Sequence, residues 1–123
     1  MVIDNVSCRG FVAKTAEKIA NDLPSVIRSL CEDAFDHNGS EQTTLVYRFD
    51  ETGLGSHTFI QSDLRIIQST CLSVIGRYEP DDLHGYRVEL RQIRYVVRVD
   101  DCACLEIVLR TTQARSWEDE ELD

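Results

Sequence analysis

The fold is decided by the stretch GYRVELRQIRYVVRVDDCACLEIVLRTT (residues 85–112), where apolar and polar residues alternate in three successive segments. These segments are YRVELR (86–91), IRYVVRV (93–99) and ACLEIVLR (103–110). Alternation with a period of two is typical of a strand that buries one face. We therefore predict a three-stranded antiparallel meander, with its apolar face covered by other elements and its polar face in water.

Helical patterns upstream supply the predicted cover. In residues 11–35 the apolar positions recur every three or four residues, which is the spacing of a helix with one buried face. Pro24 interrupts this region, and a proline inside a helix removes a hydrogen bond and restricts the residue before it. The region is therefore predicted to form two helices or one kinked helix. A third helix is predicted over residues 60–78, ending at Gly76 or at the Glu79-Pro80 pair.

Strand signals separate the N-terminal helical region from the third helix. The segment TTLVYRFD (43–50) alternates and is predicted to be a strand, followed by a glycine-containing turn. Residues 58–60 either pair back as a short strand, the reading we favour, or begin the helix directly.

This predicted order of elements over residues 8–112 resembles the cone-shaped α+β fold of the NTF2-like proteins. The resemblance rests on element order, with no residue motif. It implies a curved sheet wrapped around helices and a central pocket.

Length and composition indicate one domain with an acidic tail. A chain of 123 residues with 42% apolar and 28% charged residues is long enough to bury a core without cross-links. Its net charge is −9, and the final segment SWEDEELD (116–123) holds five of the acidic residues. We predict a single α+β domain over residues 1–115 and a disordered acidic tail over residues 116–123.

The five cysteines and the N-terminal sequence indicate a reducing compartment. An odd number of cysteines without a signal-peptide pattern favours free thiols, so a cytoplasmic or nuclear location is expected. No apolar run approaches the roughly 20 residues of a membrane span, so no membrane association is expected.

No metal site, cofactor or catalytic residue is predicted. Cys102 and Cys104 are two apart on a predicted strand and would share a face, but a structural zinc needs four ligands. His57 and His84 stand alone, and neither has a predicted partner for acid-base or nucleophilic chemistry. The balance is against an enzyme.

Arginines on the polar side of the predicted meander are the most informative feature of this acidic chain. Guanidinium groups bind carboxylates with paired hydrogen bonds and stack on aromatic rings. Cross-strand ion pairs with Glu89 and Glu106 explain part of this pattern, and a protein interface is the competing explanation. Nucleic acid is the least favoured, because the overall charge is negative. The predicted partner-binding residues, with a tryptophan from the tail, are Arg87, Arg91, Arg94, Arg98, Arg110 and Trp117.

The sequence therefore predicts a non-enzymatic protein–protein interaction module, an adaptor that works as a homodimer or as one subunit of a complex. The acidic tail either binds a partner through Trp117 or folds back onto the arginines. The alternative function is a small-ligand or catalytic pocket in a cone-shaped fold, containing Tyr47, Tyr95 and a carboxylate.

Overall fold

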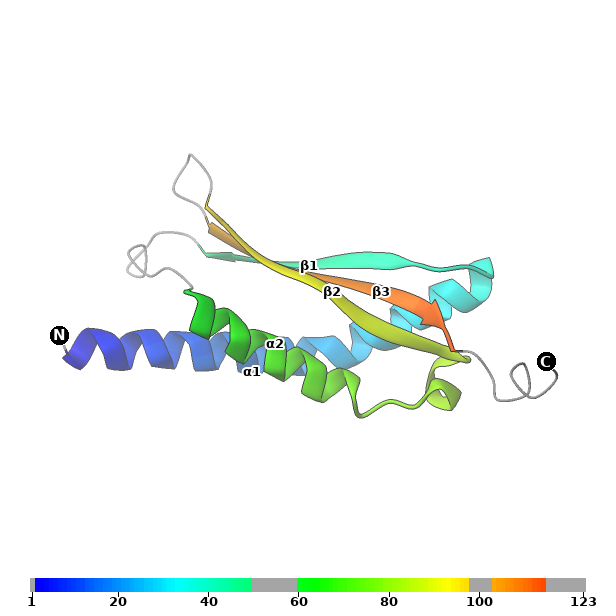
Figure 1. Ribbon diagram of the computed structural model, residues 1–123, viewed down its shortest axis with the longest axis horizontal. Coiled ribbons are helices and arrows are strands. Elements are labelled where there is room, and N and C mark those ends of the chain that lie inside the picture. Colours follow the sequence, from blue (N-terminus) through cyan, green and yellow to red (C-terminus); the bar gives the residue numbers. More distant parts are fainter. Residues whose placement is uncertain (1, 50–59, 98–102, 115–123) are drawn as a thin grey trace.

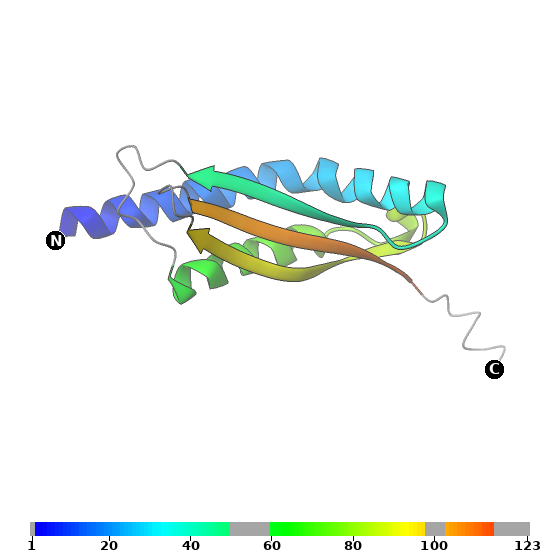
Figure 2. The same ribbon diagram turned by 90° about the horizontal axis from the view of Figure 1, so that it is seen from above.

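Helices cover one face of an antiparallel sheet, which confirms the predicted α+β class (Figure 1). The computed structural model describes residues 2–49, 60–97 and 103–114. Within these residues the helices are α1 (Val2–His37) and α2 (Gln61–Ile75), and the strands are β1 (Gln42–Phe49), β2 (Tyr86–Val97) and β3 (Ala103–Gln113). Seen from above in Figure 2, the sheet lies in front of both helices.

Helix α1 is continuous through Pro24, so the single-helix alternative is the observed one. Its axis changes direction in its second half (Figure 1), as expected when a proline removes a backbone hydrogen bond. A proline inside a helix costs about 3 kcal/mol. On both sides of Pro24, however, Ile19, Leu23 and Ile27 have no exposed surface, and burying each side chain stabilises the fold by about 1.5 to 3 kcal/mol. Packing on the sheet therefore outweighs the cost of the proline.

The predicted meander is wrong in its strand composition and order. The first two predicted segments form one strand, β2, while ACLEIVLR forms most of β3. The third strand of the sheet is β1, which precedes α2 in the chain, and the order is β1-β3-β2 with all pairs antiparallel. The element order behind the resemblance to NTF2-like proteins therefore differs from the observed one.

A β-bulge explains why β2 reads as two segments. The pairing of β2 with β3 shifts between Leu90 and Gln92, which leaves Arg91 as an extra residue. A bulge moves the alternation by one position without ending the strand. Leu90 and Ile93 consequently both face the helices, although residues three apart in a regular strand point to opposite faces. Alternation alone predicts a turn at this change of phase, and hence two strands.

Helix α2 begins at a side-chain cap and ends at a glycine. The backbone N–H of Ile60 donates to Asp63 Oδ2 at 3.0 Å, so Ile60 takes the N-cap position and Asp63 stands in the first turn. Gly76 is the C-cap, so the first of the two predicted ends is the observed one. Of the short strand favoured at residues 58–60, positions 58 and 59 lie outside the described residues. A 3₁₀ helix (Pro80–Leu83) then leads through Gly85, at φ 86°, into β2.

The core lies between the sheet and the two helices. Leu105, Ile107 and Leu109 of the central strand have no exposed surface, and they cluster with Ile67 and Cys71 of α2. The layer between the sheet and the helices is therefore apolar. No described helix covers the opposite side of the sheet (Figure 1).

Candidate protein interface on the sheet

The side of the sheet that faces away from the helices is called the outer face. The alternation of the three strands and the bulge in β2 determine which side chains belong to it. They are Gln42, Thr44, Val46 and Arg48 of β1; Arg87, Glu89, Gln92, Arg94 and Val96 of β2; and Cys104, Glu106, Val108, Arg110 and Thr112 of β3.

Three of the predicted arginines lie on this outer face. Arg87, Arg94 and Arg110 stand there, from the edge strand β2 and the central strand β3. Arg91 is separated from them by the bulge and lines a groove of about 330 Å³ together with Arg65 of α2. The remaining predicted positions, Arg98 and Trp117, lie outside the described residues, as does the acidic tail.

The sequence prediction missed a fourth arginine of the outer face, Arg48. It lies on β1 directly across from Cys104 of β3. Its alternation with Leu45 and Tyr47 already placed it on the polar side of a strand. What the local pattern lacked was the pairing of β1 with β3, which brings Arg48 onto the same surface as the other arginines.

One cross-strand ion pair is formed on this face, as the pattern of charges predicted. Arg94 Nε donates to Glu106 Oε1 at 2.9 Å, and the Nη2 group of Arg94 contacts the same oxygen. The Glu106 side chain is only 14% exposed, whereas that of Arg94 is 52% exposed. Arg48, Arg87 and Arg110 make no ion pair with another described residue. Within the part of the chain that the structure describes, these three guanidinium groups therefore have no carboxylate partner.

Apolar side chains surround the ion pair. Val46, directly across from Glu106, is 50% exposed, and Val96 and Val108 are partly exposed. Cys104, by contrast, is buried. Exposed apolar side chains gain from burial, and arginine is enriched at protein interfaces, so this surface has two features that suit a protein contact.

Tyr47 and Tyr95, which the alternative function placed in a pocket, lie on the helix side of the sheet. The Tyr47 hydroxyl donates a 2.8 Å hydrogen bond to Asp22 Oδ2 and so fastens β1 to α1. Burial, and then the hydrogen bond to Asp22, hold the pKa of Tyr47 far above its usual value, and burial also raises the pKa of Tyr95. The carboxylate that Tyr47 contacts therefore joins two elements of the fold.

The predicted cysteine pair is only partly described, because Cys102 lies outside the described residues. Cys104, Cys31 and Cys71 are buried free thiols. Across the described parts of the chain, no three His, Cys, Asp or Glu side chains come close enough to hold a metal ion. His84 is exposed and stacks on Phe35 with ring centroids 4.7 Å apart.

The chain matches no protein family, no curated protein and no solved structure. Neither α1 nor α2 has an apolar stretch long enough to cross a lipid bilayer.

Proposed function

We propose that this protein is a non-enzymatic interaction module that binds a protein partner through the outer face of its sheet. The observation that carries the proposal is the combination on one uncovered surface of exposed Val46 with three arginines, Arg48, Arg87 and Arg110, that have no described ionic partner. Unpaired guanidinium groups beside apolar side chains are typical of binding surfaces, where arginine is enriched.

Charge indicates the chemistry of the partner. The outer face holds four arginines against two glutamates, an excess of two positive charges, in a chain with a net charge of −9. An acidic partner surface complements this face and is guided to it. A symmetric dimer through the same face sets two positive surfaces against each other, so a complex with an acidic partner is favoured over the predicted homodimer.

The proposed location is the cytoplasm or nucleus. It is supported by Cys31, Cys71 and Cys104, which are buried as free thiols, the state that a reducing compartment maintains.

The experiment compares two charge-reversal variants of the full chain. Arg48→Glu/Arg110→Glu reverses two arginines of the outer face, and Arg65→Glu/Arg77→Glu makes the same change of charge at exposed positions on the helical layer. Each variant and the parent chain are immobilised and exposed to native cell extract, and sedimentation velocity gives their oligomeric states.

A stoichiometric acidic partner that is captured by the parent and the helical-layer variant, and lost by the outer-face variant, supports the proposal. Equal capture by all three proteins contradicts it. A third outcome is that the parent chain sediments as a dimer and the outer-face variant as a monomer. In that case the partner of the outer face is a second copy of this chain.

A further inference from the structure

Strand β1 has a free hydrogen-bonding edge. Just before β1, the backbone N–H of Thr111 in β3 donates to the carbonyl oxygen of Glu41 at 2.8 Å. This bond determines which residues of β1 exchange backbone hydrogen bonds with β3. In an antiparallel pair such residues alternate along the strand. The backbone N–H and C=O groups of Gln42, Thr44 and Val46, and those of Arg48, therefore point away from β3. No described residue bonds to them.

Among the described residues, this edge has few of the devices by which proteins usually prevent strand addition. Edge strands are commonly protected by proline, lysine, a bulge or a covering element. β1 has eight residues, contains no proline or lysine, has one charged residue, Arg48, near its end, and pairs with β3 in an unbroken register. The other edge strand, β2, carries the bulge at Arg91. Of the two edges, β1 is the one with regular geometry for accepting a further strand.

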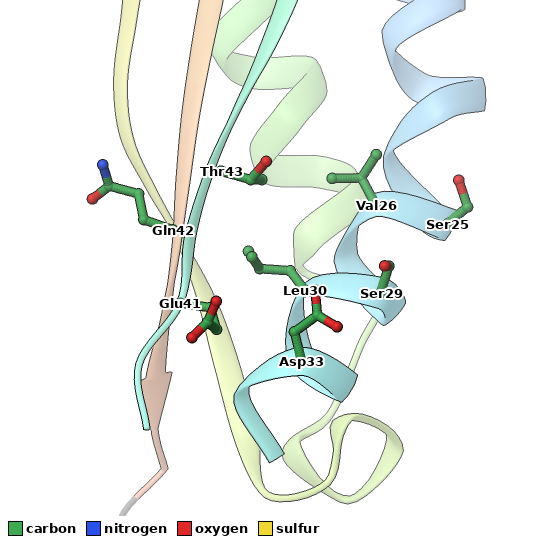
Figure 3. Close-up of a pocket in the computed structure, with 8 residues that line it drawn as sticks. All are labelled: Ser25, Val26, Ser29, Leu30, Asp33, Glu41, Gln42 and Thr43. Atoms are coloured by element: carbon green, nitrogen blue, oxygen red, sulfur yellow. The ribbon is translucent and has the colours of Figure 1, made fainter. Parts of the chain in front are cut away.

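A groove lies beside the free edge on the helix side. It has a volume of about 510 Å³ and is bounded by α1 and by the start of β1. Figure 3 shows Glu41 and Thr43 directed toward α1, whereas Gln42 points away from it. Val26 and Leu30 contribute apolar surface from the helix.

The charged side chains of this groove are both acidic. Asp33 comes from α1 and Glu41 from the residue before β1, and no lysine or arginine lines the same space. His37 Nδ1 lies 3.5 Å from Glu41 Oε2, at a surface position that is 66% exposed. The end of the groove next to the start of β1 is therefore suited to a cation.

From the edge and the groove together we propose that an extended basic peptide binds to β1 as a fourth strand. Main-chain hydrogen bonds to the free edge hold the peptide, and alternate side chains enter the groove beside α1. In the antiparallel arrangement that the rest of the sheet adopts, the peptide residue opposite Thr43 points toward α1. A lysine or arginine there reaches Asp33 and Glu41, and an apolar residue two positions earlier lies opposite Leu45.

This inference concerns a different surface from the proposed function, and the two are tested separately. The probe is the synthetic peptide TVTVTKT, whose lysine falls opposite Thr43 when its valines fall opposite Leu45 and Tyr47. The matched control is TVTVTET, which differs only in that charge. Binding to the full chain is followed by NMR, through chemical shifts and through hydrogen exchange of the β1 backbone amides.

The expected result is slower exchange of the Thr44 and Val46 amides with TVTVTKT, and binding of TVTVTET that is weaker by at least about tenfold. The variant Asp33→Asn/Glu41→Gln should bind the two peptides equally. Thr44→Pro removes one outward N–H, at a position where an edge strand tolerates proline, and should abolish binding. Its control Thr44→Ser keeps the N–H and should bind normally.

Three results would overturn the inference. The first is equal binding of the two peptides by the parent chain, and the second is protection of amides in β2 instead of β1. The third is protection of the β1 amides in the absence of peptide at high protein concentration, which identifies a second copy as the added strand. If Thr44→Pro does not fold, Asp33→Lys, a change at an exposed helical position, tests the charge requirement without altering the strand.

Discussion

The free energy of unfolding should fall as the pH rises above 9, because the fold keeps two thiols neutral. Cys31 and Cys71 have no exposed surface, and burial raises the pKa of each from 9.0 to about 11. At a pH between the pKa of the unfolded state and that of the folded state, such a thiol binds more protons in the folded protein. Its contribution to the free energy of unfolding is therefore complete below pH 9 and is lost as the pH rises toward about 11.

The size of the effect follows from these two pKa values. Each pKa unit corresponds to about 1.4 kcal/mol, so by about pH 10 the two thiols together lower the free energy of unfolding by roughly 2 to 3 kcal/mol. Tyr47 adds to the loss at higher pH, since its pKa is also raised by burial and by the hydrogen bond to Asp22. The measurement is guanidinium unfolding in reducing buffer, followed by circular dichroism, from about pH 7 to about pH 10.

The matched control is the Cys31→Ala/Cys71→Ala variant. It is less stable at neutral pH because it leaves two small cavities, but its stability should depend less on pH between 8 and 10 than that of the parent. Equal slopes in the two proteins, or no loss of stability in the parent over this range, would show that the thiols do not control the alkaline behaviour.

Three further predictions concern stability at neutral pH. Tyr47→Phe should lower the free energy of unfolding by about 1 to 2 kcal/mol, because Asp22 loses its hydrogen bond. Additive effects in a double-mutant cycle with Asp22→Ala would show that this bond contributes nothing to stability. Leu109→Ala in the central strand should cost about 2 to 5 kcal/mol by chemical unfolding, while the exposed Val46→Ala stays within about 0.5 kcal/mol; similar losses at both sites would contradict the assigned core. Gly85→Ala should cost about 1 kcal/mol, because its φ of 86° suits glycine, and an unchanged melting temperature would argue against that backbone conformation.

Local patterns predicted much of the fold. Alternation located the segments that became β1, β2 and β3, and the three-to-four spacing located both helices, because each pattern reflects which side chains a single element can bury. The position of Pro24 could not decide between one helix and two. That outcome depends on the sheet against which Ile19 and Ile27 pack, and a local window does not contain it.

The errors arose where one local pattern fits two structures. A bulge at Arg91 and a turn at the same place both shift the alternation by one residue, and only the pairing with β3 distinguishes them. The same long-range pairing places Arg48 on the same face of the sheet as Arg110, so local patterns predict the candidate interface only in part. Arg94 and Glu106 were correctly placed together, because they belong to neighbouring strands of the predicted meander.

The central position of β3 has a consequence for the order of events during synthesis. In the described sheet β1 and β2 each pair with β3 and not with each other, and β3 is the last of the three strands to leave the ribosome. Until it emerges, the growing chain has no strand that bridges the two, and the apolar sides of β1 and β2 can pack only against helix. Sheet formation is therefore a late step that involves distant parts of the chain, and a nascent chain halted before Ala103 exposes two unpaired strands to the cell's chaperones.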